Sequence, residues 1–151
     1  MNDIRIELHG LQELQSKLRS LGPELTQRII KSGLQAAADV FAAALREAAP
    51  VRTTPGERPP GELRDSVVTD VVVAPNGSEG TARVGFQHLG HLAHWLEFGH
   101  DVKRGKGAAA KVVGYAKPHP FVRAAADAAK RAAAQAFVEA VQRELKGISK
   151  S

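Results

Sequence analysis

Residues 66–86 read SVVTDVVVAPNGSEGTARVGF, and this stretch largely decides the fold. Residues 66–74 include five valines and one threonine, β-branched types that pack well on a pleated sheet, and residues 81–86 alternate between apolar and polar positions. Residues 75–80, which join these segments, combine Pro, Asn, Gly and Ser, the residue types that favour turns. The pattern predicts a β-hairpin and therefore an antiparallel sheet.

A further strand and a short helix are predicted before the hairpin. Residues 4–8 alternate apolar and charged side chains, which is typical of a half-buried strand, and Gly10 ends the pattern. Leu11, Leu14 and Leu18 then recur at helical spacing, which predicts a short helix.

Two long helices complete the predicted fold. The first covers about residues 24–48, ends before Pro50, and has an apolar face made of Ile30, Leu34, Ala37, Phe41 and Leu45. The second runs from Pro120 to about Lys146, has a stripe of Phe137, Val141 and Leu145, and ends at Gly147. Both are rich in alanine, which favours helix formation and also lets two helices approach closely. We predict an α+β fold in a single domain over residues 1–151, with an antiparallel sheet of three to four strands packed against two long Ala-rich helices.

Three connecting segments are less regular in sequence. Residues 50–60 contain four prolines and are expected to form an extended loop. Residues 101–117 contain five basic residues, three glycines and three consecutive alanines, and are also expected to be an extended, mobile loop that orders against a partner. Residues 88–99 are compatible with either a short helix or a strand.

The composition limits the cellular compartment in which the protein can be expected and the kinds of metal and disulfide sites it can form. The chain has no cysteine, so disulfides and thiolate metal sites are excluded. No run approaches the roughly 20 apolar residues of a membrane span, and the first residues lack the layout of a signal peptide, so we expect assembly in the cytoplasm without a membrane partner. The net charge of +5 permits contact with nucleic acid or an acidic protein without requiring it.

Histidines are the strongest candidates for a catalytic or metal site. On a helix, His91, His94 and Glu97 would lie near one face and could bind zinc; on a strand, His91 and His94 would lie on opposite faces. The spacing is not that of H-E-x-x-H, and no G-x-S-x-G sequence surrounds Ser66. We therefore predict no catalytic, cofactor or metal site, and a His/Glu metal hydrolase is the weakest of three functional hypotheses.

Basic residues support a second hypothesis, a sequence-independent DNA-binding module. Five of them are candidate contacts with DNA or a protein partner: Lys103, Arg104, Lys106, Lys111 and Lys117. Such residues can neutralise phosphates through salt-sensitive contacts. Tyr115 is the only aromatic residue among them, which argues against a dedicated single-strand binder.

Three short motifs in a fixed order support the first hypothesis. Residues 61–67 read GELRDSV, residues 94–99 read HWLEFG, and residues 118–125 read PHPFVRAA. This order resembles the siphophage family typified by gene product ten of the HK-type lambdoid phages, a family of tail-completion or neck proteins. The motif residues expected to serve assembly are Gly61, Leu63, Arg64, Ser66, Trp95, Glu97, Phe98, Gly99, Pro120 and Phe121. The chain departs from the family pattern at His100, where threonine is usual, and in its Pro-rich insert before Gly61.

The resemblance implies a non-enzymatic virion protein at the junction between the head-side connector and the tail. It implies a ring or ring-associated subunit, hexameric in the particle and compatible with a monomer in solution, beside connector, tail terminator or tail tube proteins. It implies no catalytic residue and no cofactor. From the residues themselves, Arg64 and Glu97 are a candidate ion pair within one subunit or between two, and Phe121 is expected to pin the last helix to the core.

Overall fold

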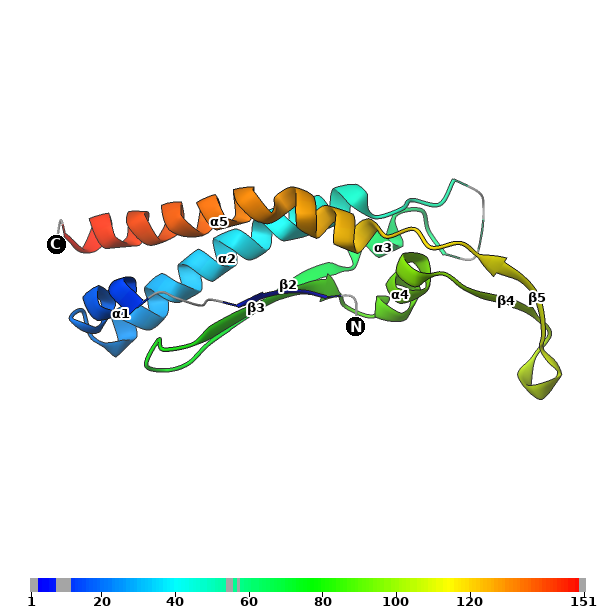
Figure 1. Cartoon of the computed structure of the whole chain (residues 1–151), viewed down its shortest axis with the longest axis horizontal. Coiled ribbons are helices and arrows are strands. Elements are labelled where there is room, and N and C mark those ends of the chain that lie inside the picture. Colours follow the sequence, from blue (N-terminus) through cyan, green and yellow to red (C-terminus); the bar gives the residue numbers. More distant parts are fainter. Residues whose placement is uncertain (1–2, 8–11, 54–55, 57, 150–151) are drawn as a thin grey trace.

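The computed structural model describes residues 3–7, 12–53, 56 and 58–149 (Figure 1). The predicted strand end at Leu8 and Gly10 and the first leucine of the predicted short helix, Leu11, lie outside the described residues. The Pro-rich connection is described at residues 50–53, 56 and 58–60, and these residues form neither helix nor strand.

The predicted hairpin and N-terminal strand form one antiparallel sheet. It contains β1 (Ile4–Glu7), β2 (Val67–Val73) and β3 (Gly80–Phe86) in the order β1-β3-β2. The β2–β3 register pairs Val67 with Phe86, and the alternation of residues along the strands gives the sheet one buried and one exposed face. Buried Ala82 and Val84 face the helices. The sheet therefore has three strands, within the predicted three to four.

Helix α2 lies between the sheet and the last helix (Figure 1). The chain forms α1 (Gln12–Arg19), α2 (Pro23–Ala48) and α5 (Phe121–Ile148), and all five residues of the predicted apolar face of α2 are buried. On α2, a Cβ atom at Gly33 would lie 2.6 Å from the ring of Phe137 and 2.9 Å from Val141 on α5. Glycine at this position therefore permits the close approach of the two long helices.

Both long helices also bury several alanines. They are Ala37, Ala38 and Ala42 on α2 and Ala125, Ala129, Ala133 and Ala140 on α5. Both alanine-rich segments are helices, as the sequence predicted. Helix α5 continues through Gly147 to Ile148, so the predicted end at Gly147 is wrong. A glycine in a helix costs only about 1 kcal/mol relative to alanine, which the flanking turns tolerate.

Residues 88–99, for which the sequence allowed either a helix or a strand, contain the helix α4 (Gly90–Phe98). A one-turn helix, α3 (Glu62–Asp65), precedes β2 and was not predicted. None of the helices in the described part of the chain combines the length and apolar character that a membrane span requires.

The prediction of an extended loop at residues 101–117 is wrong. These residues form an antiparallel ribbon of β4 (His100–Arg104) and β5 (Lys111–Ala116), joined through a 3-10 turn at Gly107–Ala109, and the ribbon projects from the end of the molecule (Figure 1). The high glycine and lysine content suggested a loop, but Val112, Val113 and Tyr115 have high strand propensity. The glycines at 105 and 107 adopt positive φ at the tip, where they form the turn that joins the two strands.

Candidate assembly surface

Glu97, in the second motif, is buried and binds the start of α5. Its side chain is 5% exposed, and its carboxylate accepts the backbone N–H of Val122 at 2.8 Å and that of Arg123 at 3.1 Å. The first N–H groups of a helix have no partner within the helix, and Pro120, at the cap position, has no polar side chain to supply one. Glu97 satisfies two of these groups and places negative charge at the positive end of the helix dipole.

The predicted Arg64–Glu97 pair is absent from the described residues of this chain. Arg64 lies at the surface, where its Nε donates to Asp65 Oδ1 at 2.9 Å, and this hydrogen bond raises the pKa of Arg64. The prediction of a pair within one subunit is wrong because it assumed that a buried carboxylate needs a cationic side chain, whereas a pair between two subunits stays a prediction. A helix N-terminus meets the same requirement with backbone N–H groups and a dipole.

The third motif is anchored to α4 and to the sheet. The backbone N–H of His119 donates to the carbonyl of Leu96 at 2.7 Å. Phe121 is buried, and its ring meets that of Phe86 on β3 edge-on at a centroid distance of 5.9 Å. Phe121 thus holds the first turn of α5 against the core, in the position that the sequence predicted for it.

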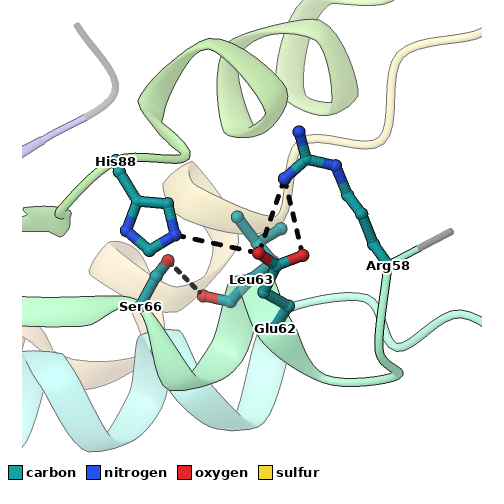
Figure 2. Close-up of polar contacts among 5 residues, drawn as sticks. All are labelled: Arg58, Glu62, Leu63, Ser66 and His88. Atoms are coloured by element: carbon teal, nitrogen blue, oxygen red, sulfur yellow. Dashed lines mark hydrogen bonds and ion pairs between the residues drawn. The ribbon is translucent and has the colours of Figure 1, made fainter.

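The first motif forms α3 and both of its ends. Gly61 has φ of 82°, a left-handed conformation that favours glycine, and Leu63 is buried. The buried hydroxyl of Ser66 donates to the carbonyl of Leu63 at 2.8 Å, as Figure 2 shows. Ser66 therefore closes a helical turn, which is a structural role.

Glu62 connects the Pro-rich segment with the segment before α4. Its carboxylate lies 3.5 Å from Nη1 of Arg58 and 3.8 Å from Nε2 of His88 (Figure 2). These contacts are partly exposed, so each contributes less than about 1 kcal/mol. A groove beside them is lined by residues of the first motif and by α4, including Gly61, Leu63, Leu92 and Leu96. The three motifs therefore meet around α4.

The solvent-facing side of α4 carries aromatic and imidazole rings. Trp95 and Phe98 are each about half exposed. Trp95 stacks on His100 at a centroid distance of 5.4 Å, while His94 packs against Phe98 at 4.9 Å. The described residues contain no group of three His, Cys, Asp or Glu side chains that could hold a metal ion. His91 and His94 are exposed and Glu97 is buried against α5, so the zinc hypothesis lacks its carboxylate.

Gly99 joins α4 to the ribbon at a position that admits no side chain. Its φ is 77°, and a Cβ atom there would lie 2.5 Å from Oη of Tyr115 and 2.6 Å from the carbonyl oxygen of Ala116. The Tyr115 hydroxyl donates to the carbonyl of Phe98 at 3.3 Å. These contacts hold the base of the ribbon against the end of α4.

The ribbon contains a bulge that gathers apolar side chains on one face. Tyr115 pairs with Asp101 and Val112 pairs with Lys103, with a register shift that leaves Val113 unpaired. Asp101 and Lys103 are two residues apart and share a face, and paired residues share a face as well. Tyr115 and Val112 therefore lie on one face although they are three residues apart, because the bulge restores their alignment. They are 59% and 57% exposed.

The predicted basic residues all belong to this ribbon or its connections. Lys103 and Arg104 lie on β4, Lys106 lies at the tip, Lys111 begins β5, and Lys117 follows it, all exposed. Their charge is evident from the sequence, whereas the exposure of Val112 and Tyr115 on a strand was not predicted. The β-branched and aromatic residues of β5 were the available signal.

The three motifs together form a junction that connects α3, α4 and α5 and holds the base of the projecting ribbon. A family model described as "Bacteriophage HK97-gp10, putative tail-component" matches residues 12–99, more than half of the chain. The chain belongs to this HK97 gp10-like family, as the motifs predicted. The match includes the first two motifs and ends at Gly99, before the ribbon and the third motif. Searches of curated proteins and of solved structures found no match to the chain.

Proposed function

We propose that this chain is a structural virion protein that completes the tail or forms part of the neck between head and tail. It acts without catalysis, as a subunit of a ring or of a ring-associated layer, and its neighbours are connector, tail terminator or tail tube proteins. Membership of a family of phage tail components supports the virion location. Six subunits in the ring is the number that the family resemblance suggests.

The observation that carries this proposal is the contrast between the braced junction and the ribbon. Glu97, Phe121 and Gly99 hold α4, α5 and the ribbon base in one arrangement. The ribbon itself exposes apolar and basic side chains to solvent. Exposed apolar surface of this kind is typical of a protein–protein contact. A rigid body with a projecting contact element suits a subunit that must join neighbouring rings.

The test is electron microscopy of lysates from the parent phage or prophage after deletion of this gene. Filled heads beside separate, unjoined or overlong tails would support a role at the tail end or neck, and normal joined particles would refute it. Complementation sharpens the result. The wild-type gene should restore joined particles, and a variant carrying Val112→Ser should not. A variant carrying Val138→Ser, an exposed α5 position, is the matched control and should restore them.

Basic residues on the ribbon favour DNA binding as a second candidate function. Lys103, Arg104 and Lys106 project with the ribbon and are free to approach phosphates. Binding of duplex DNA by the purified protein that falls steeply with salt would favour this function. Affinity that does not change when these three residues become glutamine would exclude the ribbon as the DNA contact.

A further inference from the structure

The outer face of the three-stranded sheet is a second exposed apolar surface. Within the described residues, α2 covers one face of the sheet and no element covers the other (Figure 1). Val72 on that outer face is 62% exposed, and Val68 lies on the same face of β2. β2 is also an edge strand of the sheet. Exposed edges with apolar side chains are available for contact with another chain.

A groove on this outer face carries more acidic than basic residues. Its lining includes Asp70, Val72, Glu79 and Arg83. Arg83 is opposite Asp70 in the strand register, but none of the ion pairs between described residues involves Asp70, Glu79 or Arg83. Asp70 and Val72 are two residues apart on β2 and share a face. The groove thus presents an exposed valine beside an exposed carboxylate.

The ribbon presents the complementary combination. Its bulged face carries Val112 and Tyr115 together with Lys103 and Asp101, and Asp101 is the one acid beside the five basic residues of segment 101–117. Apolar contact can bury the valines while opposite charges fix their orientation. Nucleic acid could form ion pairs with the lysines, but its charged phosphates would then lie next to the apolar side chains. A protein surface with carboxylates around an apolar centre fits both.

The groove lies on the three-stranded sheet, which extends from α4 away from the ribbon. Figure 1 shows the ribbon projecting beyond α4 at one end, whereas the turn between β2 and β3 lies near α1 at the other end. Gly77 in that turn packs on the start of α2, where a Cβ atom would lie 2.5 Å from Cγ2 of Thr26. A contact between the ribbon and the groove therefore joins two copies head to tail. Such contacts repeat from copy to copy and can close into a ring.

We propose that the β4–β5 ribbon of one copy docks on the outer β2–β3 groove of a second copy, with Lys103 and Val112 against Asp70 and Val72. This inference rests on the proposed function, because a ring of identical subunits needs a repeated contact of this type. It adds the two surfaces that make the contact.

Disulfide trapping tests this contact directly, because the natural chain has no cysteine. The variant carrying both Val112→Cys and Val72→Cys is oxidised mildly at the highest soluble protein concentration and run on a non-reducing gel. We expect a ladder of linked copies that collapses on reduction, with the highest band giving the number of copies in the closed ring. Disulfides form only when the Cα atoms come within about 7 Å, so the ladder reports the proposed proximity.

A matched control separates docking from random collision. The variant carrying Val112→Cys and Val138→Cys places the second cysteine on α5 at a similarly exposed site. It should remain mainly monomeric. Equal ladders from both variants would overturn the proposal, as would no ladder from either. Dimers from Val112→Cys alone in equal yield would replace it with a contact between two ribbons.

Charge reversal provides a second readout on the trapping variant. Lys103→Glu should lower the yield of linked copies about two- to fivefold, the effect expected for one partly exposed ion pair. Adding Asp70→Lys should restore the yield. An unchanged yield in Lys103→Glu, or a double reversal no better than the single one, would contradict the assigned pairing.

The outcome is distinguishable from failure of the proposed function. If the trapping variant gives a specific ladder but deletion of the gene leaves normal joined particles, the contact between copies is supported and the neck role is refuted. Unjoined tails after deletion, together with no specific ladder, would keep the role and overturn the contact. In that second case, an acidic surface on another tail protein becomes the occupant of the ribbon.

Discussion

Apolar side chains are buried between helices α2 and α5, whereas those of the β4–β5 ribbon are exposed to solvent. In the helix pair, Gly33 and the alanines let the two helices approach until Phe137 and Val141 are buried. In the ribbon, Val112 and Tyr115 remain more than half exposed. A two-stranded ribbon alone is marginally stable in water. The ribbon therefore depends on its base at α4, and the junction of the three motifs connects these two regions.

The difference in burial distinguishes residues that stabilise the fold from residues that are available for contact with another protein. The second motif shows the separation within six residues. Glu97 points inward to the start of α5, while Trp95 and Phe98 remain half exposed on the outer side of α4. Substitutions on the inner side should therefore lower the free energy of unfolding, and substitutions on the outer side of α4 and at Val112 on the ribbon should leave it nearly unchanged.

Phe121→Ala should have the largest effect on stability. It removes a buried ring and its edge contact with Phe86, and we expect a loss of about 3–5 kcal/mol in the free energy of unfolding. Urea unfolding followed by circular dichroism measures this loss. Phe98→Ala is the matched control because Phe98 is half exposed, and it should cost less than about 1 kcal/mol. Similar losses from both variants would contradict the inward and outward assignment.

Glu97→Ala should follow, with a loss of about 2–3 kcal/mol. It leaves the N–H groups of Val122 and Arg123 without their acceptor in a buried site. Glu97→Gln keeps the volume and one acceptor oxygen, so about half of the loss should return. Hydrogen exchange at these two amides locates the effect: both should exchange faster in Glu97→Ala. Unchanged protection there would show that the carboxylate does not cap α5.

Gly33→Val tests the close approach of the two long helices. The added side chain must displace the ring of Phe137 or separate α2 from α5, and we expect a loss of about 1–3 kcal/mol. Gly147→Ala is the control, because a Cβ atom there meets nothing within 4 Å. That substitution should stabilise the protein by up to about 1 kcal/mol through helix propensity. A stabilising Gly33→Val would show that the helices have room between them.

Val112→Ser should have the smallest effect on stability and a large effect on assembly. The side chain is more than half exposed, so the free energy of unfolding should change by less than about 0.5 kcal/mol. Thermal unfolding of the purified variant gives this change, and plaque counts in the complemented deletion strain report assembly. If the variant is destabilised, Val112 stabilises the ribbon and does not belong to the contact surface.

The sequence predicted those elements whose signals are local. The apolar face of α2 follows from helical spacing, and the β2–β3 hairpin follows from valines on both sides of a turn. The motif residues also led to the correct family. The ribbon at residues 100–116 was missed because glycine and lysine content outweighed the short β-branched run of β5.

Only the tertiary structure decided what the motif residues contact. The sequence marked Glu97 as a charge among apolar neighbours that needs a partner, but its partner lies 25 residues away in the backbone of α5. Backbone N–H groups occur at every residue except proline, so composition carries no sign of which ones will donate to a carboxylate. The shared face of Val112 and Tyr115 likewise depends on a register shift, which arises from strand pairing. The sequence alone indicated the two long helices, the β2–β3 hairpin and the family, whereas the tertiary structure decided which side chains hold the junction together and which remain exposed for contact.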